Sequence, residues 1–168
     1  MSVSRLGINA IVAVAIVVLD RWSKLAIADW LPLYSSKTMV EGFFDIVHTR
    51  NTGIAFSLFA DAGPVVKNFI LPAVSIAAIG LIVYMFAKSP NAGPISTLAL
   101  TLVLAGAVGN LYDRFAYGYV VDFLDVYVGT HHWPAFNVAD SSISVGAVLL
   151  LITSFRDEAP ISSEAKQS

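Results

Sequence analysis

Two aspartates in the C-terminal third of the chain could act as a catalytic pair. Asp122 stands in the run VVDF, and Asp140 stands further along in the run FNVAD, each beside a strongly apolar segment. When two carboxyl groups share one proton, the ionised one can take a proton from water and the neutral one can hydrogen-bond a scissile carbonyl. The pair could therefore hydrolyse a peptide bond. Helix capping and ion pairing are common roles of such aspartates, so both stay open as alternatives.

Further polar residues gather at the ends of the same apolar segments. Asn110 and Asn137 carry amides that can both donate and accept hydrogen bonds, so they could hold a substrate or satisfy a helix end. Arg114 offers a fork of donors that suits substrate carbonyls. Its neighbour Asp113 is interpreted first as the partner of Arg114 in a structural ion pair. Asn51 is followed closely by a glycine and most simply indicates a turn.

Two other groups of charged residues allow different functions. Asp20 and Lys24 are one helical turn apart, which predicts an ion pair that holds a helix in its bundle or, alternatively, part of a proton relay. His131 and His132 could bind a metal together with Asp125, but solvation in a loop is the favoured interpretation.

The composition points to a membrane protein. Of the 168 residues, 57% are hydrophobic and only 13% are charged, against about 25% charged in an ordinary soluble domain. The length predicts a single domain over residues 1–168. A net charge of -2 gives no basic field for nucleic acid. The lack of cysteine excludes disulfides, thiol nucleophiles and cysteine-based zinc sites.

The apolar pattern predicts a four-helix membrane protein with a small sheet outside the bilayer. The predicted spans are about 8–27, 65–87, 95–112 and 138–155, with outer loops 28–64 and 113–137 and a polar tail 156–168. Small residues around Gly106 and Gly109 permit close helix contact. An even number of spans puts both ends on one side. We expect that side to be the cytoplasm, with the acids at the outer face, although counting lysines and arginines does not favour this orientation.

The first outer loop is expected to contain the sheet and a lid. Alternating side chains predict a strand in which Ile46, His48 and Arg50 share one face. The apolar segment 54–59 follows a turn, and we expect it to close over a bound substrate.

Five runs, taken in order, carry a resemblance to a known family. They are LDRWSK (19–24), RNTGIAFS (50–57), GNLYDR (109–114), VVDF (120–123) and PAFNVADSSISVG (134–146). With these runs the chain resembles, over nearly its whole length, lipoprotein signal peptidase, the type II signal peptidase of bacteria. Arg21 stands in the first run where glutamine is familiar.

The resemblance implies a membrane aspartic peptidase of the bacterial inner membrane that uses no metal or cofactor. Such enzymes remove signal peptides from prolipoproteins just before a cysteine that carries a diacylglyceryl group. The catalytic dyad would be Asp122 and Asp140. Substrate-binding positions would be Asn51, Gly53, Asn110, Arg114 and Asn137, and supporting positions would be Asp20, Lys24, Gly106, Asp113 and Ala139.

The expected partners are lipidated prolipoproteins and membrane lipids, with no nucleic acid, and a monomer would suffice. A small transporter or channel subunit is the competing functional class, because acidic and basic residues at a membrane edge are used in proton relays. A structural four-helix adaptor is a third class, in which both Asp122 and Asp140 should be replaceable without loss.

Overall fold

The computed structural model describes residues 3–53, 63, 65–88 and 92–157. Its helices are α1 (Val3–Trp30), α2 (Leu71–Lys88), α3 (Pro94–Tyr117) and α4 (Val138–Asp157), and a π-helical turn, η2 (Val66–Ile70), leads into α2. Its strands are β1 (Ser36–Val40), β2 (Phe44–Asn51), β3 (Val120–Val128) and β4 (His131–His132). The predicted lid segment, 54–59, lies outside the described residues.

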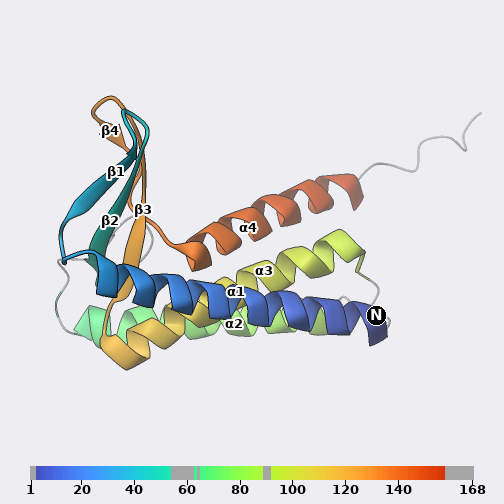
Figure 1. The fold of residues 1–168 in the computed structure, drawn as a ribbon. Helices are drawn as coiled ribbons and strands as arrows, with labels where there is room; N and C mark the ends of the chain where they lie inside the picture. Colours follow the sequence, from blue (N-terminus) through green and yellow to red (C-terminus); the bar gives the residue numbers. More distant parts are fainter. Residues whose placement is uncertain (1–2, 54–62, 64, 89–91, 158–168) are drawn as a thin grey trace, which may run out of the picture.

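The four helices lie side by side, and the sheet stands at one end of the bundle (Figure 1). The start of α1 and the end of α4 both lie at the opposite end (Figure 1). Helix α3 is central, because it packs against α1, α2 and α4. The predicted helices are thus present. Helices α1, α3 and α4 extend beyond their expected bounds, whereas the predicted span 65–87 is formed by η2 followed by α2.

Two of the described helices are long and apolar enough to cross a membrane. These are Pro94–Tyr117 of α3 and Val138–Phe155 of α4. The apolar part of α2, Pro72–Lys88, is shorter. Charged residues interrupt the last third of α1, namely Asp20, Arg21, Lys24 and Asp29. The described chain is therefore largely helical, with two helices that could each span a membrane, and the sequence prediction of four spans stays a prediction.

Glycines allow α3 to approach its neighbours closely, as the sequence indicated. A Cβ atom on Gly106 would collide with the carbonyl oxygen of Ala139 in α4. A Cβ on Gly109 would lie 2.9 Å from the Asp20 carboxylate of α1. Both contacts involve Ala139 and Asp20, residues that the resemblance implies to be supporting, so the glycines bring α1 and α4 against the same face of α3.

The strands form one antiparallel sheet in the order β1-β2-β3-β4. The predicted alternation along β2 was wrong, because its pairing with β3 is irregular between Ile46 and Thr49. His48 is consequently buried, with Nδ1 2.7 Å from the Leu31 carbonyl oxygen, whereas Arg50 is exposed. Such an irregularity inserts an extra residue and turns the following side chains to the other face.

Candidate active site

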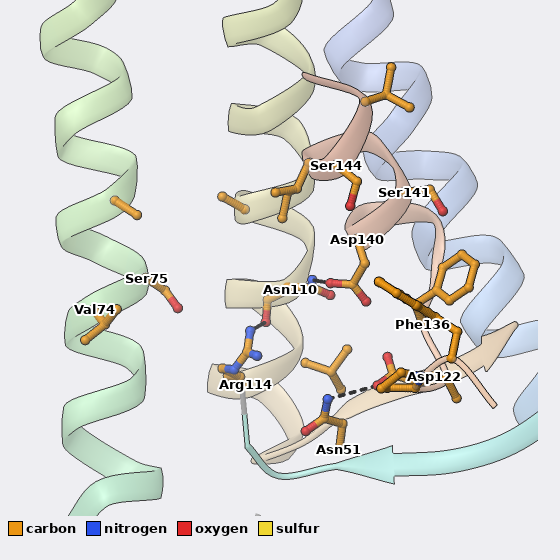
Figure 2. Close-up of a pocket in the computed structure, with 18 residues that line it drawn as sticks. Asn51, Val74, Ser75, Asn110, Arg114, Asp122, Phe136, Asp140, Ser141 and Ser144 are labelled. Carbon is orange, nitrogen blue, oxygen red and sulfur yellow. Dashed lines mark hydrogen bonds between the residues drawn. The ribbon is translucent and has the colours of Figure 1, made fainter. Parts of the chain in front are cut away.

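A cavity of about 560 Å³ lies between α2, α3, α4 and β3. Asp122 and Asp140 both line it, together with Asn51, Asn110 and Arg114 (Figure 2). The acids therefore reach one cavity, as the sequence predicted.

The chain path explains how the two acids meet. Gly118 ends α3 in the left-handed conformation, at φ 76°, and lets the chain turn directly into β3, which carries Asp122. Beyond the β4 turn the chain comes back along β3, where Phe136 accepts hydrogen bonds from the Phe123 and Leu124 amides. Helix α4 begins immediately after this return, so Asp140 in its first turn is delivered beside Asp122.

Asn137 connects the two acids. Its Nδ2 donates to Asp122 Oδ1 at 2.7 Å, and its backbone N–H donates to Asp140 Oδ2 at 3.2 Å. The Asp140 N–H donates in return to Asn137 Oδ1 at 2.9 Å. This reciprocal exchange is a capping box at the start of α4. The capping role considered for Asn137 is therefore confirmed, and the same contacts orient its amide toward Asp122.

Asn110 is oriented by a buried lysine. Lys24 Nζ donates to Asn110 Oδ1 at 3.0 Å, and Asn137 Nδ2 lies 3.3 Å from the same oxygen. The Asn110 Nδ2 group therefore points at Asp140 and donates to its Oδ1 at 2.8 Å. Each carboxylate oxygen of Asp140 thus accepts one N–H donor.

The end of β2 and the turn after it contribute further contacts to the site. Asn51 Oδ1 accepts from the Gly53 N–H at 2.8 Å, which confirms the predicted turn, while Asn51 Nδ2 donates to Asp122 Oδ2 at 2.9 Å. Arg114 donates through Nη2 to the Gly53 carbonyl at 3.1 Å and through Nη1 to the Asn110 carbonyl at 3.2 Å. Among the described residues, Arg114 Nε is the buried side-chain nitrogen that has no partner.

A buried charge network supports these residues from behind. Lys24 Nζ is 2.7 Å from Asp20 and 2.6 Å from Asp113, so the predicted pair with Asp20 is confirmed. Asp20 also accepts a hydrogen bond of 2.9 Å from the Ala139 N–H and so satisfies the start of α4. The predicted pairing of Asp113 with Arg114 was wrong, because Asp113 pairs with Lys24 and, at 3.0 Å, with Arg21. Three acceptors around Lys24 favour a structural role over a proton relay.

Burial makes Asp122 harder to ionise. Desolvation, followed by the nearby charge of Asp140, raises the Asp122 pKa to about 7, against the opposing effect of the Asn51 and Asn137 hydrogen bonds. A carboxyl group with such a pKa is at least half protonated up to about pH 7. Asp122 can therefore act as a hydrogen-bond donor in the cavity.

The histidines that suggested a metal site lie outside the cavity. His131 and His132 are both exposed, and His132 Nδ1 is 2.9 Å from Asp125. Over the described residues, no group of three His, Asp or Glu side chains has an arrangement that could hold a metal ion.

Sequence reasoning missed most of the cavity wall. Small and apolar residues of two helices line it, namely Val74, Ser75 and Ala78 of α2 and Ser141, Ile143, Ser144 and Val145 of α4. Figure 2 shows Ser75 across the cavity from Asp140 and Ser144. Ser144 is one helical turn beyond Asp140, and this spacing was the available signal for it.

Comparison with known proteins gives a consistent assignment. The profile of the family described as Signal peptidase (SPase) II matches residues 12–156. A lipoprotein signal peptidase of Geobacter sulfurreducens is 45% identical over 150 residues, which cover 89% of this chain and 92% of that protein. One from Syntrophus aciditrophicus is 41% identical over 142 residues, covering 84% and 88%.

Solved structures agree in fold. One, described as a bacterial membrane enzyme, is 31% identical to this chain with a TM-score of 0.80, and the match covers 96% of this chain and 95% of that one. A second structure with the same description is 32% identical with a TM-score of 0.80, covering 90% and 94%. With the family profile matched from residue 12 to residue 156 and the same fold found in a membrane enzyme, the chain belongs to the signal peptidase II family.

Proposed function

We propose that this chain is a membrane aspartic endopeptidase that removes the signal peptide from diacylglyceryl-modified prolipoproteins, cutting on the N-terminal side of the lipidated cysteine. Membership of the family supports a peptidase of lipoprotein precursors. The observation that carries the aspartic mechanism is the arrangement of Asp122 and Asp140 in one cavity, with Asn137 hydrogen-bonded to both.

In this mechanism Asp140 starts ionised and Asp122 starts protonated. Two amide donors and the first turn of α4 favour negative charge on Asp140. The raised pKa, about 7, favours the proton on Asp122. Because the two groups titrate as a pair, this assignment describes the reactive form of the dyad.

Hydrolysis then needs no group other than the dyad and water. Asp140 removes a proton from a water molecule as its oxygen attacks the scissile carbonyl carbon, and Asp122 gives its proton to the carbonyl oxygen. In the collapse of the tetrahedral intermediate, Asp122 takes that proton back and Asp140 protonates the departing nitrogen. The C–N bond breaks, and both acids return to their starting forms.

Arg114 and Asn51 are proposed to hold the substrate backbone. Two of the Arg114 nitrogens are used for the Asn110 and Gly53 carbonyls, while its buried Nε has no partner among the described residues. An unpaired buried donor is costly unless a ligand satisfies it. A substrate carbonyl beside the dyad would supply the missing acceptor. Gly53 would act indirectly, because its carbonyl oxygen accepts a hydrogen bond from Arg114 and so holds the guanidinium in place.

The supporting residues are proposed to hold the site residues in position. Lys24, Asp20 and Asp113 fix the Asn110 amide and the start of α4. Gly106 and Ala139 allow α3 and α4 to touch, which keeps Asn110 within reach of Asp140.

The membrane arrangement is proposed to have four spans, cytoplasmic ends and a site at the outer face. Large apolar side chains on α1 are more than half exposed, including those of Leu6, Ile8, Ile11, Val14 and Val18. In water such a continuous apolar surface would be an aggregation site, whereas lipid would cover it. A cavity with apolar walls below the acids would accept an apolar signal helix and its lipid.

The proposed activity can be tested on the full chain in detergent. A diacylglyceryl-modified precursor is incubated with the enzyme in water enriched in oxygen-18, and both products are analysed by mass spectrometry. We expect one product to begin at the lipidated cysteine and the released signal peptide to carry one heavy oxygen in its new carboxylate. The matched control is Asp125→Asn, because Asp125 is an acid of β3 outside the cavity lining, and it should cleave normally. Absence of cleavage, or a rate abolished by a chelator and restored by zinc, would contradict the proposal.

A further inference from the structure

Arginine and tyrosine side chains form a second polar feature at the sheet end of the bundle. Arg21 of α1 lies over the rings of Tyr112 and Tyr117 of α3, at 5.4 and 4.7 Å from their centroids. Arg50 of β2 lies over the ring of Tyr119 at 4.3 Å. The three tyrosines are themselves in contact, with centroids 6.3 Å apart for Tyr112 and Tyr117 and 6.1 Å apart for Tyr117 and Tyr119. We call these five residues the Arg–Tyr strip.

The strip is accessible from outside the protein. Tyr112 is 54% exposed and Tyr117 is 44% exposed, and the Arg50 side chain is exposed as well. None of the five residues that define it lines the catalytic cavity. Aromatic side chains of this kind are enriched where a membrane protein passes from hydrocarbon to headgroups. In the orientation proposed above, the strip lies at the headgroup level of the outer leaflet.

The two arginines differ in how their charges are used. Arg21 donates to Asp113 at 3.0 Å and to the Tyr117 hydroxyl, so its charge is compensated. For Arg50 the described structure records the contact with the Tyr119 ring and no ion pair or side-chain hydrogen bond. The Arg50 guanidinium thus lies over an aromatic ring, and the described structure records no other side-chain contact for its N–H donors. That geometry suits two oxygens of one phosphate group.

We propose that the Arg–Tyr strip binds the headgroup of an anionic phospholipid, with the phosphodiester oxygens on the Arg50 guanidinium and the tyrosine hydroxyls toward the polar part of the lipid. The proposal rests on the membrane placement in the proposed function and not on the peptidase chemistry. A zwitterionic choline lipid fits less well, because one face of each tyrosine ring already lies against an arginine and the guanidinium repels the ammonium.

Binding is tested on the purified full chain in detergent, without any precursor, so that the result does not depend on cleavage. Equimolar phosphatidylglycerol and phosphatidylcholine are added, and the lipid retained by the protein is counted by native mass spectrometry. We expect phosphatidylglycerol to be retained preferentially. Arg50→Gln should weaken its retention about tenfold, as expected for the loss of a charge-assisted bidentate contact.

The matched control is Lys88→Gln, since Lys88 also lies over a tyrosine, Tyr84, at 5.9 Å, but at the opposite end of the bundle. Its phosphatidylglycerol retention should equal that of the unmodified chain, and inorganic phosphate added at constant ionic strength should not displace the lipid. Equal retention of the two lipids, equal loss in both variants, or displacement by free phosphate at constant ionic strength would overturn the proposal.

A salt titration of the unmodified chain gives a measurement that needs no variant, because raised ionic strength should release the anionic lipid. Retention that does not respond to salt would count against it.

Discussion

Asn137 determines how the two acids are presented. Its side-chain amide has both ends occupied, with Oδ1 accepting from the Asp140 N–H and Nδ2 donating to Asp122. The side chain therefore cannot rotate by half a turn without losing both contacts. One residue thus fixes the start of α4 and the orientation of a carboxylate on β3, so helix capping and the proposed catalysis depend on the same contacts.

Ionisation of Asp122 should couple activity and stability to pH. Its folded pKa of about 7 lies above the ordinary value of 3.8 because burial disfavours the charged form. The folded state therefore binds the proton more tightly than the unfolded state, and the stability it contributes is lost as pH rises toward and through 7. We expect the cleavage rate to fall above about pH 7. Between pH 5 and pH 8 the unmodified chain should therefore lose about 3 kcal/mol of folding free energy that Asp122→Asn keeps.

Thermal unfolding in detergent at pH 5 and pH 8 measures this directly. The stability of Asp122→Asn relative to the unmodified chain should rise by about 3 kcal/mol from pH 5 to pH 8. The exposed acid Glu41, in the turn between β1 and β2, supplies the comparison, and the effect of Glu41→Gln should be the same at both pH values. A stability difference between Asp122→Asn and the unmodified chain that is the same at both pH values would show that burial of this charge is not costly.

The lysine behind the site should matter more for folding than for chemistry. Lys24 is buried and neutralises Asp20 and Asp113, so Lys24→Met leaves two buried carboxylates without their lysine partner. We expect a loss of about 3 to 5 kcal/mol in the free energy of unfolding. Adding Asp113→Asn should recover part of it. Lys37→Met is the control, because Lys37 is exposed on β1 and should change stability little. Unfolding in a denaturing detergent would measure all three, and an unaffected Lys24→Met would contradict the role of the network.

At the scale of elements, much of the site could be predicted because its residues stand at the ends of predicted helices. Asn110, Asp140 and Asn137 are each local features of α3 or the start of α4. The partner of Asp113 could not be predicted in this way. Adjacent residues on a helix point in different directions, so Arg114 faces the cavity while Asp113 faces Lys24 and Arg21 on α1. That pairing depends on helix packing, which neighbouring residues do not specify.

Close contact between α3 and α4 depends on Gly106. A Cβ there would collide with the Ala139 carbonyl, which belongs to the rigid helix backbone. Gly106→Ala should therefore push α4 away, lower the free energy of unfolding by about 2 kcal/mol and reduce cleavage by separating Asn110 from Asp140. Gly80→Ala is the matched control in α2, because no atom lies within 4 Å of its would-be Cβ, and it should gain up to about 1 kcal/mol. Equal behaviour of the two variants in thermal unfolding and cleavage would rule out this contact as a determinant.

At the scale of the whole molecule, the sheet and the described chain ends lie at opposite ends of the helix bundle (Figure 1). Both described chain ends thus lie at the same end of the bundle, as an even number of membrane crossings requires. The cavity walls and the irregularity in β2 were not predictable, since each depends on contacts between elements distant in the sequence. The bundle could be predicted from the composition and from the lengths of the apolar segments. The geometry of the site could not, because it depends on how the chain returns along β3.

The natural lack of cysteine allows the proposed orientation to be measured without background labelling. Single cysteines are introduced at Val128, at the sheet end, and at Ser154, near the end of α4, both of which are exposed. In intact spheroplasts a membrane-impermeant maleimide should label Val128→Cys, and Ser154→Cys should react only after permeabilisation. The reverse pattern would invert the orientation, and labelling of both from outside would show that α4 does not cross the membrane.

The claim that Asp122 and Asp140 act as one unit is tested most directly by single-turnover cleavage of a lipidated precursor by the two single variants and the double variant, each carrying Asn in place of Asp. If the acids share one proton and one water, either single substitution should lower the rate by at least about a thousandfold, and the double variant should be no slower than the slower single one. A single variant that keeps a rate near that of the unmodified chain, or losses that multiply in the double variant, would show that the two acids do not form a catalytic dyad.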